Sequence, residues 1–209
     1  MFLIDPYRFA VGDAPVSRVA ALGSAVTGSP FTLPAHAAGD LLLVFVRSGT
    51  TSLPTLPTGY TNIGTLVPTV GNAFRLCWVI DDDNSRTTVA ATNANQWGVL
   101  VYRGATGIGA SQISDSGSGN ETATIPALTL TDTSGESWVA AGASLNQART
   151  LSAASGLTAL LNNASPELGG GRWAMWDTAA GVASFASRTS TWTGQGSAFW
   201  GSWAVEVLT

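Results

Sequence analysis

The sequence predicts an all-β protein, an antiparallel β-sandwich of the jelly-roll type. Residues 41–46 form an unbroken apolar run, with Gly39 and Asp40 before it and Arg47 and Ser48 after it. Six residues are too few for a membrane span and short for a helix, so the run predicts a strand buried on both faces. Other short apolar runs fit partner strands, and two weakly matching halves suggest the paired Greek keys of a jelly roll.

The first half predicts a series of short strands separated by Gly-, Pro- and Thr-rich turns. We place these strands at residues 17–29, 31–33, 39–47, 60–66, 74–80, 87–91 and 97–104. The segment 39–47 is the central strand of the series. A loop dense in Gly and Ser is expected over residues 104–120 and connects the two halves.

The second half predicts a similar series. Strands are expected at residues 122–130, 137–144, 172–177, 181–187 and 199–208. Pro126 interrupts the first of these strands and makes it an edge strand. Residues 148–163 fit either a short helix or a loop with a strand, and residues 189–197 fit a polar loop.

The two halves, about 30–105 and 121–209, align as a weak internal repeat. The distance from Gly39 to Arg75 is 36 residues, and the distance from Gly135 to Arg172 is 37 residues. We treat residues 15–209 as one domain, because two domains of half this size would each bury too little surface. Chance agreement within β-rich sequence is the alternative explanation of the match.

Composition limits the kinds of partner that the surface can bind. Charged residues make up 11% of the 209 residues, against roughly 25% in an average soluble domain. A surface of Ser, Thr, Asn, Gln and Gly suits packing against other protein. The net charge of −4, without a stripe of Arg, argues against nucleic-acid binding. No run approaches the ~18 apolar residues of a membrane span, and no leader peptide is evident, so we expect synthesis in the cytoplasm without membrane insertion.

Catalytic and metal-binding patterns are weak. His36, the only histidine, is expected to be an exposed turn residue, because no Cys or carboxylate cluster and no Gly-x-Ser-x-Gly elbow accompanies it. The adjacent acids at 81–83 fit a solvated turn better than a calcium loop, whose alternating ligands are absent. Asp177 and Glu206, beside aromatic strands, are the candidates for a pair of glycosidase carboxylates. Cys77 is expected to be a buried small hydrophobe. The sequence predicts no cofactor, no metal site and no enzyme.

Two groups of aromatic residues carry the predictions about partners. Residues 1–14 form an apolar arm that either docks onto another subunit or folds back as a first strand. Its candidate docking residues are Phe2, Leu3, Ile4, Tyr7 and Phe9. Trp173, Trp176 and Trp192 lie in Gly-flanked or polar surroundings, and exposed rings there could stack on sugars. Core packing is the alternative for these three Trp residues.

Several segments of the first half together resemble a recurrent pattern in structural proteins of tailed bacteriophages and gene transfer agents. The segments are Gly39-Asp40-Leu41-Leu42-Leu43-Val44, Pro57-Thr58-Gly59-Tyr60-Thr61, Arg75 to Ile80 and Val101-Tyr102-Arg103-Gly104, with the arm Phe2 to Phe9 before them. The resemblance covers residues 1–105 and implies a β-sandwich module of a tail fibre, spike or head decoration.

The resemblance implies a virion structural protein that contacts other virion subunits through its arm. It also implies a homo-oligomer, most often a trimer in spikes, and contact with a host surface polysaccharide would suit the exposed loops. It supplies no catalytic residues. Two alternatives stay open: a carbohydrate-binding module without a virion role, and a glycan-acting hydrolase of the same shape.

Overall fold

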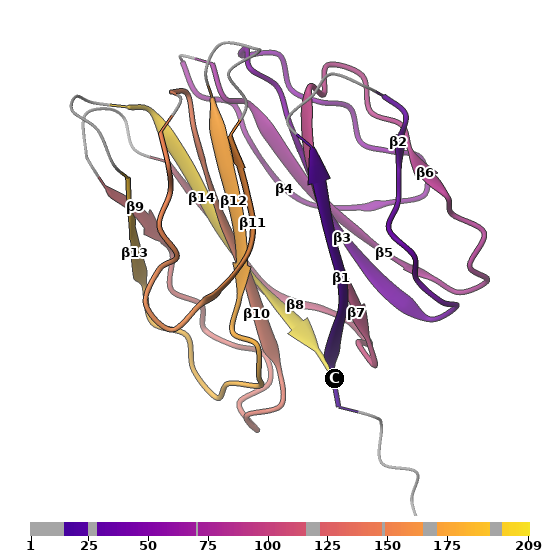
Figure 1. Ribbon diagram of the computed structural model, residues 1–209. Helices are drawn as coiled ribbons and strands as arrows, with labels where there is room; N and C mark the ends of the chain where they lie inside the picture. The colour runs from indigo at the N-terminus through magenta and orange to yellow at the C-terminus, as the bar shows by residue number, and fades with distance from the viewer. Residues whose placement is uncertain are drawn as a thin grey trace, which may run out of the picture.

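Every regular element that the structure describes is a β-strand (Figure 1). The computed structural model describes residues 15–24, 29–69, 71–115, 122–147, 149–164, 171–192 and 198–209. The first seven strands are β1 (Ser17–Ser24), β2 (Phe31–Thr32), β3 (Asp40–Arg47), β4 (Thr61–Leu66), β5 (Phe74–Asp81), β6 (Thr88–Val89) and β7 (Gln96–Arg103). The other seven are β8 (Gly107–Asp115), β9 (Thr122–Ile125), β10 (Trp138–Leu145), β11 (Thr158–Ala164), β12 (Arg172–Asp177), β13 (Arg188–Thr191) and β14 (Trp200–Leu208). These residues contain no helix long and apolar enough to cross a bilayer.

The strands stack in four layers, with two large sheets in the middle and a small sheet on each outer side (Figure 1). The large sheets have the orders β1-β7-β3-β5-β4 and β11-β12-β10-β14-β8, and all neighbouring strands are antiparallel. The small sheets are β2-β6 and β13-β9. The predicted antiparallel β-sandwich is therefore confirmed.

The connectivity differs from the expected jelly roll. A jelly roll has eight strands in two sheets, whereas here each five-stranded sheet takes all its strands from one half of the chain. Strands that are near in sequence pair within their own half, so no described strand ladder joins the two large sheets.

The second half repeats the strand order of the first. The strands β1-β7-β3-β5-β4 correspond to β8-β14-β10-β12-β11, each seven elements later in the chain. Gly39 and Gly135, before β3 and β10, have φ values of +84° and +96°, and Gly59 and Gly156, before β4 and β11, have +78° and +76°. The two large sheets touch where β1 contacts β11 and where β4 contacts β8. Because β1 corresponds to β8 and β4 corresponds to β11, these two contacts are equivalent under the repeat. The two halves thus face each other about an approximate two-fold axis.

Strand β3 lies in the middle of its sheet and is buried on both faces, as its apolar run predicts. Leu41, Leu43 and Phe45 pack into the core between the two large sheets. Leu42, Val44 and Val46 pack into a second core beneath the β2-β6 pair. Cys77 lies in this second core as predicted, and burial raises the pKa of its thiol to about 12. A third core fills the space between the second large sheet and β9-β13.

All four edge strands of the two large sheets carry a bulge. The extra residue is Val19 in β1, Ile63 in β4 and Leu160 in β11. In β8, residues 109 and 110 both lie opposite Glu206 of β14. Bulges interrupt the regular ladder that another strand would need for pairing. The edges of the two large sheets are therefore poor templates for sheet extension.

A buried polar clasp joins the halves at the end of β3. Arg47 donates hydrogen bonds to Asn72 Oδ1 (2.6 Å), Gln96 Oε1 (2.6 Å) and the carbonyl oxygen of Leu145 on β10 (3.0 Å). Gln96 in turn donates from Nε2 to the carbonyl oxygen of Gly171 (3.2 Å). We call Arg47, Asn72 and Gln96 the polar clasp. No carboxylate among the described residues forms a salt bridge with Arg47.

Two predicted elements of the second half need correction, and a third prediction that left two alternatives is decided. Residues 107–115, expected to be loop, form edge strand β8, which is held by its ladder with β14 despite its small and polar residues. The strand expected at 181–187 is instead β13, at 188–191, because it pairs with β9. Residues 158–164 form β11, so of the two alternatives for residues 148–163 the loop with a strand is confirmed in the described part, and the short helix is wrong.

Candidate functional site

The three tryptophans proposed for glycan contact are buried, so that prediction is wrong. The side chains of Trp173 and Trp176 are 0% exposed, and Trp192 is 6% exposed. Strand β12 alternates its side chains between two cores: Trp173 packs between the large sheets and Trp176 packs under β9-β13. Trp192 joins the same outer core. Their Gly-rich and polar neighbours suggested exposure because the sequence did not reveal that both faces of β12 are covered.

The candidate docking residues of the arm, Phe2, Leu3, Ile4, Tyr7 and Phe9, lie outside the described residues. The body begins beside the other end of the chain. Ser17 of β1 pairs with Arg103, and the carbonyl oxygen of Thr209 accepts a hydrogen bond from the Thr106 hydroxyl (2.8 Å). The arm is therefore attached to the body at the end where the C-terminal strand finishes (Figure 1).

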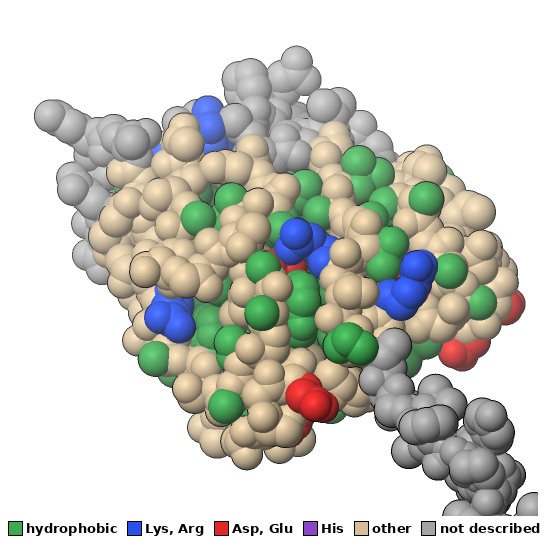
Figure 2. All heavy atoms as spheres, turned by 60° about the horizontal axis from the view of Figure 1, so that its bottom comes forward, with side chains coloured by type: hydrophobic (Ala, Val, Ile, Leu, Met, Phe, Trp, Pro, Cys, Tyr) green, Lys and Arg blue, Asp and Glu red, His purple; other side chains and the backbone are tan. Residues whose placement is uncertain are grey.

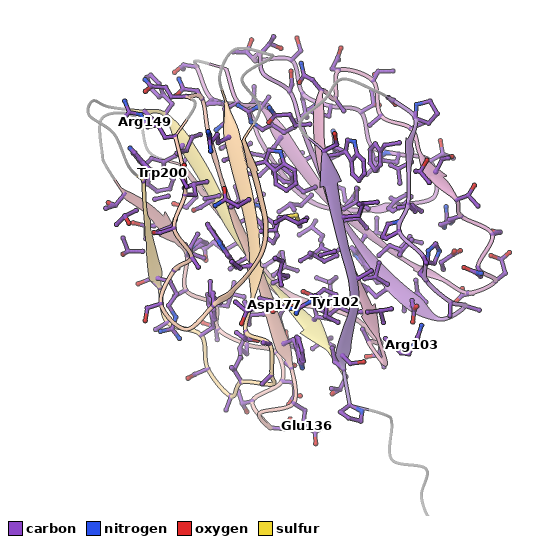
Figure 3. The ribbon with its side chains drawn as sticks, in the orientation of Figure 1. Tyr102, Arg103, Glu136, Arg149, Asp177 and Trp200 are labelled. Atoms are coloured by element: carbon purple, nitrogen blue, oxygen red, sulfur yellow. The ribbon has the colours of Figure 1, made fainter. Side chains whose placement is uncertain are left out.

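Asp177 and Glu206 do not form a catalytic pair, because they project from opposite faces of the same sheet. Asp177 points between the large sheets, where Arg18 Nη1 donates to both its oxygens (2.6 and 2.7 Å) and the Tyr102 hydroxyl lies 3.3 Å away (Figure 3). Glu206 points outward and accepts three backbone N–H bonds, from Ala110 (2.8 Å) and from residues 131 and 132 (2.8 and 2.9 Å).

The environment of Glu206 also opposes a role as a proton donor. Burial would raise the pKa of Glu206, but the backbone hydrogen bonds that it accepts outweigh this effect and lower its pKa below the usual value. A general acid of a glycosidase needs the opposite shift. Glu206 instead anchors the bulge of β8 and the loop at residues 131–132 to β14.

The three carboxylates of the acidic turn at residues 81–83 do not point toward a common site. Asp81 is 2% exposed and points inward, whereas Asp82 and Asp83 are exposed. Asp83 accepts a hydrogen bond from the backbone N–H of Ser85 (3.0 Å). No group of three or more metal-ligating side chains occurs within the described ranges. The arrangement is that of a structural turn.

A surface pocket of about 320 Å³ lies where the small β2-β6 sheet ends. One wall is the segment 32–36 and the other consists of Asn84, Arg86 and Thr87. The backbone N–H of Leu33 donates to the carbonyl oxygen of Thr87 (2.9 Å), so the two walls continue the pairing of β2 with β6. Sheet pairing thus holds the base of the pocket in one geometry.

His36 is largely buried at this pocket, which corrects the prediction of an exposed turn residue. Its side chain is 5% exposed. Its Nδ1 lies 2.8 Å from the carbonyl oxygen of Pro34, and its Nε2 lies 2.8 Å from Asp81 Oδ2. Each ring nitrogen therefore lies within hydrogen-bond distance of one oxygen of the protein. Neither nitrogen is left to take a proton from a nucleophile, which argues against a general base.

Arg86 forms the opposite wall and is held by two contacts. Its guanidinium lies over the ring of Tyr60, 5.3 Å from the centroid, and its Nε lies 3.6 Å from Asp81 Oδ1. Its backbone N–H also donates to Asp81 Oδ2 (3.2 Å). Within the described part of the chain, the terminal Nη1 and Nη2 make no hydrogen bond. The arginine is thus fixed in place with hydrogen-bond donors to spare.

The second half repeats part of this arrangement. Arg188 lies over the ring of Phe185, 5.5 Å from the centroid, and near Gly156, as Arg86 lies over Tyr60 and near Gly59. The second half has no histidine. The fold therefore does not require the contact between His36 and Asp81.

The pocket was missed because its walls are far apart in the sequence. His36 and Asp81 are separated by 45 residues. A clue was present, since antiparallel pairing of the two strongest strands places Asp40 opposite Asp81. This pairing brings Asp81 beside the turn that contains His36.

Comparison of the chain with protein-family models, curated proteins and solved structures found no match.

Proposed function

We propose that the protein is a structural subunit on the surface of a virion, of the phage or phage-like kind, held to its neighbours by residues 1–14. The subunit is made in the bacterial cytoplasm and assembles as a homo-oligomer, for which the family resemblance implies a trimer. The sandwich serves as a rigid body that displays loops, and it performs no catalysis.

The observation that carries this proposal is the contrast between the arm and the body. The four edges of the large sheets are bulged, so the described body is poorly suited to associate by strand pairing. The arm concentrates five large apolar residues within residues 2–9. Apolar segments of this kind mark interaction surfaces. Association therefore falls to the arm.

The surface of the body supports the same proposal. Figure 2 shows isolated charged side chains set among neutral ones on the face that includes the lower end of the molecule in Figure 1. Such a neutral surface is suited to close packing beside other subunits. The side chains of His36, Asp81, Asp177 and Glu206 all make hydrogen bonds within the protein, which supports a role without acid–base chemistry.

Deletion of residues 1–12 tests the docking role. We expect the truncated chain to stay folded, because the described strands begin at Ser17, and to be lost from particles that retain the full-length chain. Particle association is measured by sedimentation and immunoblotting. A matched control replaces the polar residues Asp5, Arg8 and Asp13 by serine and should associate normally. Normal incorporation of the truncated chain would show that the docking role is wrong.

A carbohydrate-binding module is the second candidate, and the pocket beside His36 favours it. Its volume of about 320 Å³ lies in the range of small-molecule sites. The particle-association assay separates the two functions, because a carbohydrate-binding module without a virion role would bind sugar and would not join particles.

A further inference from the structure

We propose that the pocket between residues 32–36 and 84–87 binds one neutral sugar residue. This inference deepens the proposed surface role, on which it rests for its biological setting. The binding itself depends only on the folded body and not on the arm. The pocket thus takes the place of Trp173, Trp176 and Trp192, which are buried, as the proposed site of glycan contact.

The pocket wall offers hydrogen-bonding groups that suit a polyhydroxyl ligand. Arg86, whose side chain is 31% exposed, lines the pocket together with Asn84, Thr32 and Thr87. A guanidinium donates hydrogen bonds, whereas an amide and a hydroxyl can both donate and accept them. Leu33 adds an apolar lining against which the C–H face of a sugar can pack.

The charges around the pocket favour a neutral ligand. Asp81 lies between His36 and Arg86, at 2.8 and 3.6 Å, so the positive groups already face a carboxylate. Asp82 and Asp83 are exposed on the adjoining turn. An acidic sugar would be repelled by these two carboxylates, whereas a hydroxyl group can donate to them. The turn therefore selects against anions that Arg86 alone would attract.

The pocket is also preorganised. His36 fastens its turn to Asp81 at the end of β5, and Tyr60 supports the guanidinium of Arg86. Groups that are already fixed lose little conformational freedom on binding. Because the second half keeps Arg188 over Phe185 without a histidine, we assign the His36–Asp81 contact to the pocket rather than to the fold.

Titration of the full-length chain with methyl glycosides tests the inference. The probes are the methyl glycosides of glucose, galactose, mannose and N-acetylglucosamine, with that of glucuronic acid as the charged comparison. Binding is followed by two-dimensional NMR. We expect at least one neutral glycoside to shift the resonances of residues 32–36 and 84–87 and the glucuronide to bind more weakly.

Two variants localise the binding. Arg86→Met should weaken binding by about tenfold, because hydrogen bonds from a charged donor are lost. Thr87→Val should weaken it less and leaves the contact between Arg86 and Asp81 intact. Arg188→Met, the matched control in the second half, should bind as the unaltered chain does. Thermal unfolding of each variant checks that the fold is kept.

Three results would overturn the inference: no neutral glycoside binds, the glucuronide binds best, or Arg86→Met and Thr87→Val both bind unchanged. The chain lacking residues 1–12 separates this inference from the proposed function. We expect it to bind sugar normally even when it fails to join particles. A pocket that fails to bind sugar leaves the docking experiment unaffected.

Discussion

Replacing Arg47 by methionine tests whether the polar clasp holds the two halves of the sandwich together. Arg47 is 1% exposed, and its donors reach Asn72 and Gln96 in the first half and Leu145 in the second. Burial lowers the pKa of Arg47 to about 10, so the side chain is still charged at neutral pH. Methionine keeps much of the length of the side chain and removes all three hydrogen bonds.

The expected loss of stability follows from the acceptors left behind. Asn72 Oδ1 keeps the hydrogen bond from the Ser144 hydroxyl, and Leu145 stays within the ladders of β10 with β12 and β14, whereas Gln96 Oε1 loses its buried donor. One orphaned acceptor costs about 1–3 kcal/mol, and the lost bonds to Asn72 and Leu145 add about 1 kcal/mol each. Removal of a buried charge without a carboxylate partner offsets part of this cost. We expect a net destabilisation of about 3 kcal/mol.

Equilibrium unfolding in urea at neutral pH measures this loss. The control is Arg75→Met on the neighbouring strand β5. Arg75 bonds to Asn62 Oδ1 (2.6 Å) and to the carbonyl oxygen of Pro54 (2.9 Å) in partly exposed surroundings, so this change should cost under about 1 kcal/mol. Adding Gln96→Met to Arg47→Met should recover part of the stability by removing one orphaned acceptor. Equal losses for Arg47→Met and Arg75→Met would refute the reasoning.

Two further predictions concern the core and the pH dependence of stability. A Cβ at Gly98 would lie 2.6 Å from Met175 Sδ and 2.8 Å from the Trp173 ring, so Gly98→Ala should destabilise by about 1–3 kcal/mol. Gly107→Ala, where the nearest atom lies 3.8 Å away, should change thermal stability little. Because the pKa of Glu206 is lowered in the folded state, its contribution is present above pH ~4.5 and lost as pH falls through the lower folded value. Glu206→Gln should therefore unfold with a flatter dependence on acid pH, and an unchanged slope would contradict the assignment.

Local sequence predicted the strong strands because their residues carry the information. The apolar run 41–46 lies between two turns and is long enough for a single strand. Its six apolar side chains alternate between the two faces of that strand, so each face requires a core. The matched glycines before β3 and β10 likewise marked corresponding turns. Strand β8 escaped prediction because its small and polar residues become a strand only through pairing with β14.

The candidate site was less predictable from the sequence. The residue types of the pocket were visible, since His36 is the only histidine and Asp81 begins the acidic run. Their contact depends on the antiparallel register of β3 with β5, which closes a separation of 45 residues. The position of Arg86 over the ring of Tyr60 likewise depends on tertiary contacts, because the two residues lie in different turns of the chain.

The sequence by itself determined an all-β sandwich, a central strand at residues 39–47 and a chain poor in charge. Only the tertiary structure decided which faces of those strands are covered. Trp173 and Trp176 lie on opposite faces of β12 as strand geometry requires, yet both are buried because a large sheet lies on one side and the β9-β13 pair on the other. Period-two alternation assigns side chains to faces, and long-range packing decides whether a face meets solvent or a core.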